Sequence, residues 1–338
     1  MIERVLGHLA AHGIDQAVLS LGYRPDSFLA AYPDGKAAGV KITYAIEPEL
    51  LDTAGAIRFA ARTAAIDETF VAVNGDVLTD GDVSALISFH ESSGAEATIY
   101  LSPVQDPSRF GVVPTGLDGR VLEFVEKPPP GQAPTNLINA GIYVMEPRVL
   151  DRIPEGRRVS VERETFPALA SEGVLFALSD GAYWLDTGTP EAYLRAQRDL
   201  LELTRGEPPT PGATRATPAT STGPGAWVLG RPEISGSVDR FSLVADGAQV
   251  CPGAVVERSV LGPHCIVEPG TRVEGSVLLA ATRVMQDAIV SASIVGHRCV
   301  IGKGASVAEL SILGDDVSVG DLAEVVSGRL RATLAKPS

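Results

Sequence analysis

The segment FVAVNGDVLTD (residues 70–80) and the residues that follow it decide the fold of this 338-residue chain. Its apolar start is typical of a buried strand, and Asn74-Gly75 is a turn signal. VSALISFHESSG (83–94) then shows helical spacing with a glycine stop, and EATIYLSPV (96–104) is again rich in strand formers. Strand, helix and strand in this order predict an α/β domain with a mainly parallel sheet.

Asp76 lies directly after this turn, at the carboxyl end of the predicted strand. Ligands of open parallel sheets bind beyond the carboxyl ends of the strands, so a carboxylate at this point is a candidate functional residue. The residues alone leave a second interpretation open, in which Asp76 only caps the Asn74-Gly75 turn.

The α/β pattern extends toward the amino terminus. A helical pattern begins at Ile2 and stops at Gly13, and two strand patterns and a further helical pattern follow, QAVLSLGY (16–23), VKITYAIE (40–47) and AGAIRFAARTA (54–64). We therefore assign residues 1–204 to one α/β domain.

Residues 205–226, RGEPPTPGATRATPATSTGPGA, consist mostly of Pro, Thr, Ala and Gly and contain almost no bulky apolar side chain. Such a segment cannot bury enough surface to offset the entropy that is lost on ordering. We therefore expect a linker that is partly extended and partly flexible.

Beyond this linker, aliphatic residues recur every six positions, and the pattern restarts every 17 residues, with 18 at the last step. The repeating positions are Val244, Val250, Val256, Leu261, Val267, Val273, Leu278, Val284, Val290, Val295, Ile301, Val307, Leu313, Val319 and Val325. Three short sides per turn, each with one inward aliphatic residue, predict a parallel β-helix of five coils within residues 227–330. The alternative, a sandwich with spaced valines, would not keep this register for so long.

The composition limits the partners of the protein. A formal net charge of −14 argues against nucleic acid or an anionic membrane as a partner. No apolar run approaches the roughly 20 residues of a membrane span, and the first residues do not resemble a signal peptide. The three cysteines, Cys251, Cys265 and Cys299, fit neither a zinc pattern nor a disulfide framework and are expected to be buried thiols. We expect a soluble, cytoplasmic protein.

Six segments of the first domain occur in an order that is more specific than any one of them. They are LDTAGAI (51–57), VNGDVLTD (73–80), RFGVV (109–113), EFVEKP (123–128), NAGIYVMEP (139–147) and YWLDTGTPEAY (183–193). Together they resemble the sugar-1-phosphate nucleotidyltransferases, and the hexapeptide repeat that follows resembles the mannose-1-phosphate guanylyltransferase branch. The resemblance implies a Rossmann-like nucleotidyltransferase domain followed by a left-handed parallel β-helix.

The reaction implied by this resemblance is nucleotidyl transfer from an NTP, expected to be GTP, to a sugar-1-phosphate, expected to be mannose-1-phosphate. Positioning and a metal ion carry most of the catalysis of such a transfer. Mg²⁺ needs only one or two carboxylates besides phosphates and water, and by resemblance these would be Asp76 and Asp186. An alternative role for Asp186 is to cap the helix near Pro190, although Thr189 fits that role better. Trp184 is expected to be a core residue beside this metal site.

The resemblance also assigns the sugar phosphate to residues of three segments. Glu126 and Lys127 would meet the sugar hydroxyls and the phosphate, with Lys127 as a catalytic point charge. Asn139, Gly141 and Gly111 would line the sugar site, where glycine lets the backbone approach the ligand. The residues alone leave open a solvent-facing ion pair of Glu126 with Lys127, and a simple strand bulge at Gly111.

The nucleotide contacts implied by the resemblance come from the start of the helical pattern at residues 54–64, with the three residues before it, and from the turn before Asp76. They are Leu51, Asp52, Thr53, Ala54, Gly55 and Gly75. The family usually reads L-G-T-A-G at the first five of these positions, so Asp52 stands where a glycine backbone would lie close to the base. Its side chain and its charge leave the identity of the nucleotide open.

The Gly-rich motif of the family, G-G-x-G-T-R-L, wraps the nucleotide phosphates with backbone N–H groups and occurs nowhere in this sequence. The opening, MIERVLGHLAAHGID, resembles the family sequence that follows this region. The domain is therefore expected to lack its first strand and its phosphate loop. A misplaced start codon, a truncated gene or a loss of catalysis would each explain this.

Two other functions stay open on the sequence alone. A non-catalytic relative that binds sugar nucleotides would account for the absent loop and for Asp52. An acyltransferase site in the β-helix, at His264 or His297, is less favoured because five coils without an inserted loop offer little to hold an acyl carrier. A homo-oligomer assembled through the β-helix is compatible with the sequence.

Overall fold

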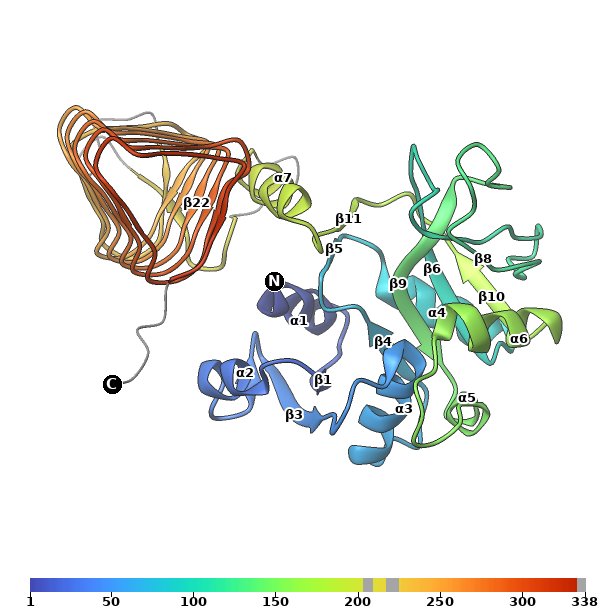
Figure 1. Cartoon of the computed structure of the whole chain (residues 1–338). Helices are drawn as coiled ribbons and strands as arrows, with labels where there is room; N and C mark the ends of the chain where they lie inside the picture. Colours follow the sequence, from blue (N-terminus) through green and yellow to red (C-terminus); the bar gives the residue numbers. More distant parts are fainter. Residues whose placement is uncertain (203–208, 217–224, 333–338) are drawn as a thin grey trace. The chain divides into compact units, whose positions relative to one another are not determined.

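The chain forms two compact units in the computed structural model, Met1–Asp186 and Thr187–Ser338 (Figure 1). The structure describes three stretches, residues 1–202, 209–216 and 225–332. Positions 205–208 and 217–224 of the predicted linker lie outside the described residues.

The first unit alternates helices and strands, which confirms the predicted α/β class. Its helices are α1 (Ile2–Ala11), α2 (Pro25–Ala31), α3 (Asp52–Thr63), α4 (Val83–Ser93), α5 (Arg148–Arg152) and α6 (Phe166–Ser171), and the π-helical turn Val161–Thr165 precedes α6. Its strands are β1 (Gln16–Leu21), β2 (Lys36–Ala37), β3 (Val40–Ile46), β4 (Phe70–Val73), β5 (Val77–Thr79), β6 (Ala97–Pro103), β7 (Gly111–Val112), β8 (Val125–Glu126), β9 (Leu137–Met145), β10 (Leu175–Leu178) and β11 (Trp184–Asp186).

Helices cover both faces of the central sheet because its strands are apolar on both sides. Val71 of β4 and Val144 of β9 pack against Leu86 of α4 on one face. Their neighbours Phe70 and Tyr143 pack on the other face with residues of α3, α5 and α6. Successive side chains of a strand point to opposite faces, so continuous apolar strands need cover on both sides. The result is a three-layer arrangement in which α4 lies on one side of β9.

The sheet of the first unit is divided, and its longest strand runs against its neighbours. β1 pairs with β3 in parallel and β10 with β6 in parallel, but β9 lies between β4 and β6 and is antiparallel to both. The prediction of a mainly parallel sheet is therefore wrong at β9. Among the described residues β1 pairs only with β3, and β4 only with β9.

Capping signals set the helix ends near the β4–β5 turn. At the start of α4, Oδ1 of Asp82 accepts a hydrogen bond from Ala85 N at 2.9 Å. The same helix ends at Gly94, which has a φ of +65°, and α1 is followed by Gly13 with a φ of +84°. Side-chain oxygens at the first position and glycine after the last are the usual helix limits. Both predicted glycine stops are confirmed.

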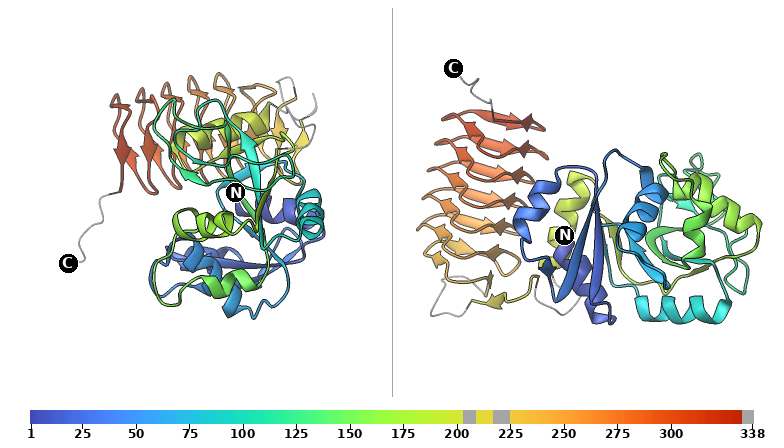
Figure 2. Two further views of the ribbon diagram at one scale, coloured as in Figure 1. Left: turned by 90° about the vertical axis from the view of Figure 1, so that its right-hand side faces the viewer. Right: turned by 90° about the horizontal axis from the view of Figure 1, so that it is seen from below.

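The second unit begins with α7 (Pro190–Leu201) and continues as a parallel β-helix, whose stacked coils are visible in Figure 2. One of its three sheets contains β12 (Thr214–Arg215), β13 (Trp227–Val228), β16 (Leu243–Val244), β19 (Val260–Leu261), β22 (Val277–Leu278), β25 (Ile294–Val295), β28 (Ile312–Leu313) and β31 (Arg329–Leu330). The second contains β14 (Glu233–Ile234), β17 (Gln249–Val250), β20 (Ile266–Val267), β23 (Arg283–Val284), β26 (Val300–Ile301) and β29 (Ser318–Val319). The third contains β15 (Ser237–Val238), β18 (Val255–Glu257), β21 (Arg272–Glu274), β24 (Ile289–Ser291), β27 (Ser306–Ala308) and β30 (Glu324–Val326).

The β-helix has about six coils, because two of its sheets contain six stacked strands each, and the prediction of five coils is wrong. The additional coil comes first and contains Ile234 and Val238, which pair with Val250 and Val256 of the next coil. Ile234 and Val238 are four positions apart in the sequence, whereas Val250 and Val256 are six positions apart. The shortened side breaks the six-residue period and hides this coil from a search of the sequence.

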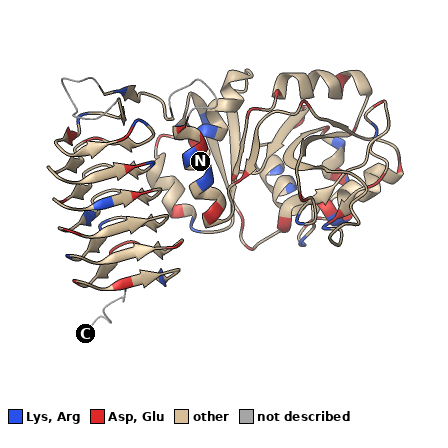
Figure 3. Ribbon diagram, turned by 90° about the horizontal axis from the view of Figure 1, so that it is seen from above, with Lys and Arg blue, Asp and Glu red and all other residues tan. Residues whose placement is uncertain are grey.

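The burial of the cysteines, the distribution of charged residues and the length of the helices can each be compared with the predictions made from composition. Cys265 and Cys299 are buried in the β-helix core, and burial raises the pKa of Cys265 to about 11, whereas Cys251 is only half-buried. Figure 3 shows Lys and Arg interspersed with Asp and Glu along the ribbon of each unit. In the described part of the chain, no helix has both the length and the apolar character needed to cross a membrane.

Candidate active site

Two carboxylates, Asp76 and Asp186, come together from segments that are far apart in the sequence. Asp76 ends the turn between β4 and β5, and Val77 is the first residue of β5. β11 pairs with β5 in antiparallel register, which places Asp186 directly opposite Val77. Opposite residues of paired strands have Cβ atoms roughly 5 Å apart, so Asp76 lies one residue along the chain from the partner of Asp186.

The ionisation of Asp76 reflects this neighbourhood. Partial burial and the negative charge of Asp186 together raise the pKa of Asp76, although a hydrogen bond from its own backbone N–H acts in the opposite direction. A cation shared by two such carboxylates would offset their repulsion.

The donor set of this pair fits Mg²⁺. Mg²⁺ prefers oxygen ligands and keeps several waters, so two carboxylates with substrate phosphates complete a site. The described residues contain no group of three or more His, Cys, Asp or Glu side chains that could hold a metal. Asp76 and Asp186 would be the protein ligands of such a site.

The helix-cap interpretation of Asp186 is wrong. The N-cap of α7 is Thr189, whose Oγ1 accepts a hydrogen bond from Ala192 N at 3.2 Å. The turn interpretation of Asp76 holds in part, since this carboxylate bonds to its own backbone N–H. The turn itself is closed by a backbone hydrogen bond from Val77 N to Asn74 O at 3.3 Å.

Asn139 and Gly141 lie in an irregular part of β9. The pairing of β9 with β6 shifts register between Ile99 and Leu101. Gly141 has a φ of +76° there, a conformation that glycine adopts without strain. Asn139 stabilises the irregularity, since its Oδ1 accepts from Gly141 N at 3.0 Å and its Nδ2 donates to Tyr143 Oη at 2.9 Å. Irregularities of this kind re-aim the chain and are frequent beside active sites.

Strands β7 and β8 bring Gly111 and Glu126 together as a directly paired residue couple. Gly111 and Val112 pair with Glu126 and Val125 without a register shift, so the bulge interpretation is wrong. A Cβ on Gly111 would lie 2.6 Å from Phe124 Cζ, which favours glycine at this position. Nζ of Lys127 lies 3.2 Å from Oε1 of Glu126, and 59% of the Lys127 side chain is exposed. The structure thus contains the solvent-facing ion pair that the sequence left open, with an ammonium group accessible to an anion.

The start of α3, where nucleotide contacts are expected, is tied to one residue of a distant loop. Ala54 N and Gly55 N donate to Val159 O at 2.9 and 3.3 Å, and Val159 N donates to Leu51 O at 3.0 Å. A Cβ on Gly55 would lie 2.9 Å from the Cβ of Leu51. Two amides of the segment are therefore engaged inside the protein, and the glycine is required by packing.

Asp52 has an exposed side chain and a φ of +60°. Its Oδ1 accepts a hydrogen bond from the neighbouring Thr53 N at 2.8 Å. Asp is one of the few non-glycine residues that tolerate left-handed backbone, partly through such local hydrogen bonds. The conformation of this position, which the sequence did not reveal, by itself explains why glycine suits it in the family. Gly75, the remaining expected contact, is exposed in the Asp76 turn.

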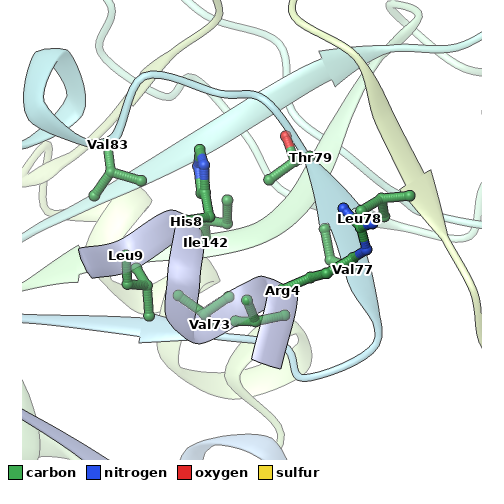
Figure 4. Close-up of a pocket in the computed structure, with 10 residues that line it drawn as sticks. Arg4, His8, Leu9, Val73, Val77, Leu78, Thr79, Val83 and Ile142 are labelled. Carbon is green, nitrogen blue, oxygen red and sulfur yellow. The ribbon is translucent and has the colours of Figure 1, made fainter. Parts of the chain in front are cut away.

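A cavity lies between α1 and the strands that lead into and out of the Asp76 turn (Figure 4). Its lining is mostly apolar and includes Val73 of β4 and Ile142 of β9. Arg4 extends from α1 toward Val77 and brings a cation beside the strand that follows Asp76. Sequence reasoning missed Arg4, because the helical pattern marks it only as a polar residue and nothing in the sequence links it to β5.

His264 and His297 lie in turns of two different coils of the β-helix and do not form one site. His264 is exposed and has a φ of +58°, and its N–H donates to Asp246 O at 2.9 Å. The backbone N–H of His297 donates to Oδ1 of Asp315 at 2.9 Å. These are the contacts of turn residues.

Comparisons with known proteins cover both units. Residues 1–202 match the family model described as nucleotidyl transferase, and residues 238–330 match the model described as GMPPB C-terminal domain. A mannose-1-phosphate guanylyltransferase of Mycobacterium tuberculosis is 40% identical over 286 residues, which are 84% of this chain and 72% of that protein. Mannose-1-phosphate guanylyltransferase 1 of Arabidopsis thaliana is 34% identical over 328 residues, which are 95% of this chain and 84% of that protein.

Solved structures give the same assignment for the first unit. HddC from Yersinia pseudotuberculosis superposes with a TM-score of 0.50 at 28% identity, covering 57% of this chain and 82% of that chain. The same protein has also been solved in complex with GMP-PN. The chain therefore belongs to the nucleotidyl transferase family, in the branch of mannose-1-phosphate guanylyltransferases that carry a C-terminal β-helix.

Proposed function

We propose that this protein transfers the guanylyl group of GTP to mannose-1-phosphate, forming GDP-mannose and pyrophosphate, with Mg²⁺ held by Asp76 and Asp186. Family membership supports the reaction class, and the names of the relatives support the base and the sugar. The observation that carries the proposal is the convergence of two carboxylates where β5 pairs with β11, since the charge of Asp186 contributes to the raised pKa of Asp76.

The reaction brings two anions together. A phosphate oxygen of the sugar phosphate forms a bond to the α-phosphorus of GTP, the bond from that phosphorus to the bridging oxygen breaks, and pyrophosphate leaves with the electron pair. Bound Mg²⁺ would neutralise phosphate charge and stabilise the leaving pyrophosphate. The task of Asp76 and Asp186 is to present ionised oxygens to the metal ion at a fixed spacing. Holding the two reactants in the right geometry can lower the activation barrier of the transfer by roughly 7–11 kcal/mol.

The sugar phosphate is proposed to bind at β7, β8 and the irregular part of β9. Lys127 is exposed and can turn its ammonium group from Glu126 toward a phosphate. Glu126 is then available to sugar hydroxyls. The backbone at Gly111 and at Asn139–Gly141 lies on strands next to this pair, because Val112 of β7 pairs with Ile138 of β9.

The test is pyrophosphate release with mannose-1-phosphate and a panel of GTP, ATP, UTP and dTTP. We expect release with GTP that requires Mg²⁺ and stops when a chelator is added. The assay should use this chain and also a form extended by any residues encoded in frame before Met1. Absence of release by both forms with every nucleotide would contradict an enzymatic function.

A second candidate is a relative that binds sugar nucleotides without turnover. The observation that favours it is the engagement of Ala54 N and Gly55 N with Val159 O at the expected nucleotide segment. Calorimetric titration with GDP-mannose distinguishes the two candidates. Binding without release of pyrophosphate by either form supports the second candidate, and turnover removes it.

A further inference from the structure

The irregular part of β9 offers two neighbouring carbonyl groups to the segments that carry the carboxylates. Asn139, Ala140 and Gly141 form what we term the β9 bend. Gly141 O accepts a hydrogen bond from Asn74 N at 2.8 Å. Ala140 O accepts a hydrogen bond from Nε1 of Trp184 at 2.9 Å. One short stretch of backbone therefore contacts both the β4–β5 turn and β11.

Each of these donors stands two residues before a carboxylate. Asn74 precedes Asp76 in the β4–β5 turn, and Trp184 precedes Asp186 in β11. The pairing of β5 with β11 fixes how the two strands run, but the β9 bend fixes where both of them lie against the sheet. A shift of the bend would move both carboxylates.

The Trp184 ring also contacts the segment proposed to bind the sugar phosphate. It packs edge-to-face against Phe110, with ring centroids 5.5 Å apart and an interplanar angle of 81°. Phe110 directly precedes Gly111, and its carbonyl accepts a hydrogen bond from Lys127 N at 3.1 Å. One side chain thus touches the metal side and the sugar side of the candidate site.

We propose that Trp184 is a positioning residue that sets the spacing of Asp76 and Asp186 through the indole N–H to Ala140 O. This inference rests on the proposed function, because the spacing matters only if the two carboxylates share a cation. The sequence suggested a plain core residue, and the hydrogen bond assigns the indole N–H a role that an apolar ring of the same size could not fill.

The competing explanation is that Trp184 only fills space. Its ring does pack against the core cluster that contains Leu86 and Tyr100, so the test must keep the ring and remove the N–H. 3-Benzothienylalanine at position 184 has this property, and Trp184→Phe is the genetically encoded variant. The chain supplies a matched control in Trp227, whose buried Nε1 has no hydrogen-bond partner among the described residues.

Metal binding is measured with Mn²⁺ as the probe, by electron paramagnetic resonance on the full chain. We expect the two Trp184 replacements to weaken Mn²⁺ binding about 10- to 100-fold, the usual effect of removing a residue that orients a metal ligand. Trp227→Phe should bind Mn²⁺ like the wild type. Unchanged Mn²⁺ affinity in both Trp184 replacements, whatever their melting temperatures, would overturn the positioning role.

A second measurement does not depend on metal. Hydrogen exchange of the Asn74 amide, followed by NMR, reports the hydrogen bond that Asn74 N donates to Gly141 O of the β9 bend. Both Trp184 replacements should accelerate this exchange at least about tenfold, whereas Trp227→Phe should not change it. Wild-type protein that binds no Mn²⁺ contradicts the proposed function alone. Unchanged Asn74 exchange in the Trp184 replacements contradicts the positioning role alone.

Discussion

Single residues with unusual backbone conformation shape the candidate site. Gly141 with a φ of +76° makes the irregularity of β9, and Asp52 with a φ of +60° begins α3. Left-handed backbone costs an ordinary residue roughly 1–2 kcal/mol, so such positions persist only where the surroundings require them. Both residues lie in segments that were singled out from the sequence, but the reason for each became visible only in the structure.

Gly141→Ala should lower the unfolding free energy more than a Gly→Ala substitution at another glycine with positive φ. A Cβ at this position would lie 2.6 Å from Nδ2 of Asn74, so the alanine would strain the backbone and also displace the turn that carries Asp76. We expect a loss of about 2–4 kcal/mol of unfolding free energy, measured by urea denaturation, and loss of Mn²⁺ binding.

Gly94→Ala is the matched control for this prediction. Gly94 has a φ of +65° but has open space around its Cβ position, so only the backbone strain of about 1 kcal/mol applies. Equal losses of stability in the two variants would contradict a steric role of Gly141 toward Asn74.

Asp52→Asn and Asp52→Gly test the charge of this residue, because both remove the charge and keep the backbone conformation. Both variants tolerate a positive φ and remove the negative charge, while only Asn retains a side-chain oxygen for Thr53 N. If the nucleotide lies near Asp52, both variants should bind GTP about two- to fivefold more tightly, the range for an exposed charge. Fluorescence titration with a labelled GTP analogue measures this, and unchanged affinity in both places the nucleotide elsewhere.

At the scale of elements, regular patterns were predictable and their interruptions were not. The six-residue period gave the β-helix, because each coil repeats the same three sides. The final 18-residue step corresponds to a corner where Glu309 and Leu310 both have positive φ, whereas the matching corner of the preceding coil has only Ala292. Likewise, the register shift of β9 depends on pairing with β6, a contact between distant segments that no local pattern encodes.

Leu278→Ala should destabilise the β-helix by about 2–5 kcal/mol, because its side chain is fully buried in the stacked core. Leu322 is 82% exposed near the last coil, so Leu322→Ala should change the unfolding free energy by less than about 0.5 kcal/mol. Chemical denaturation followed by circular dichroism measures both. A similar effect of the two substitutions would contradict the assignment of Leu278 to the core.

A pH-dependent contact between His90 of α4 and Glu146 links this helix to the residue that follows β9. Burial tends to raise the pKa of Glu146, but hydrogen bonds from Thr69 and His90 outweigh this effect and lower it. The buried ring of His90 lies with Nε2 3.2 Å from Oε1 of Glu146. Because the folded-state pKa is lowered, the contact stabilises the protein above the ordinary value of about 4.3, and this stability is lost as the pH falls through the folded-state pKa.

Glu146→Gln should therefore be less stable than the wild type at pH 7, and the difference should shrink as the pH falls below about 4. Urea midpoints measured from pH 3 to pH 7 test this. Glu91→Gln, an exposed position on the same helix, is the control and should follow the wild type throughout. A difference that stays constant with pH would contradict the role of the Glu146 carboxylate.

At the scale of the whole molecule, the division into an α/β unit and a β-helix was readable from the sequence. Ordered motifs also indicated the family and the carboxylates Asp76 and Asp186. The structure adds that Asp186 is paired with Val77, the residue that follows Asp76. The contacts between the motifs could not be predicted from the sequence. Trp184 to Ala140 is a contact between residues 44 positions apart in the sequence, and its donor looked like an ordinary core residue.

The most direct test of the central claim is kcat/KM for pyrophosphate release from GTP and mannose-1-phosphate in the wild type, in Asp76→Asn and in Asp186→Asn. The amides keep the shape of the carboxylates and remove their charges. If the pair holds the catalytic Mg²⁺, each substitution should lower kcat/KM by at least about 10²–10³-fold. Turnover that survives both substitutions unchanged would contradict the account.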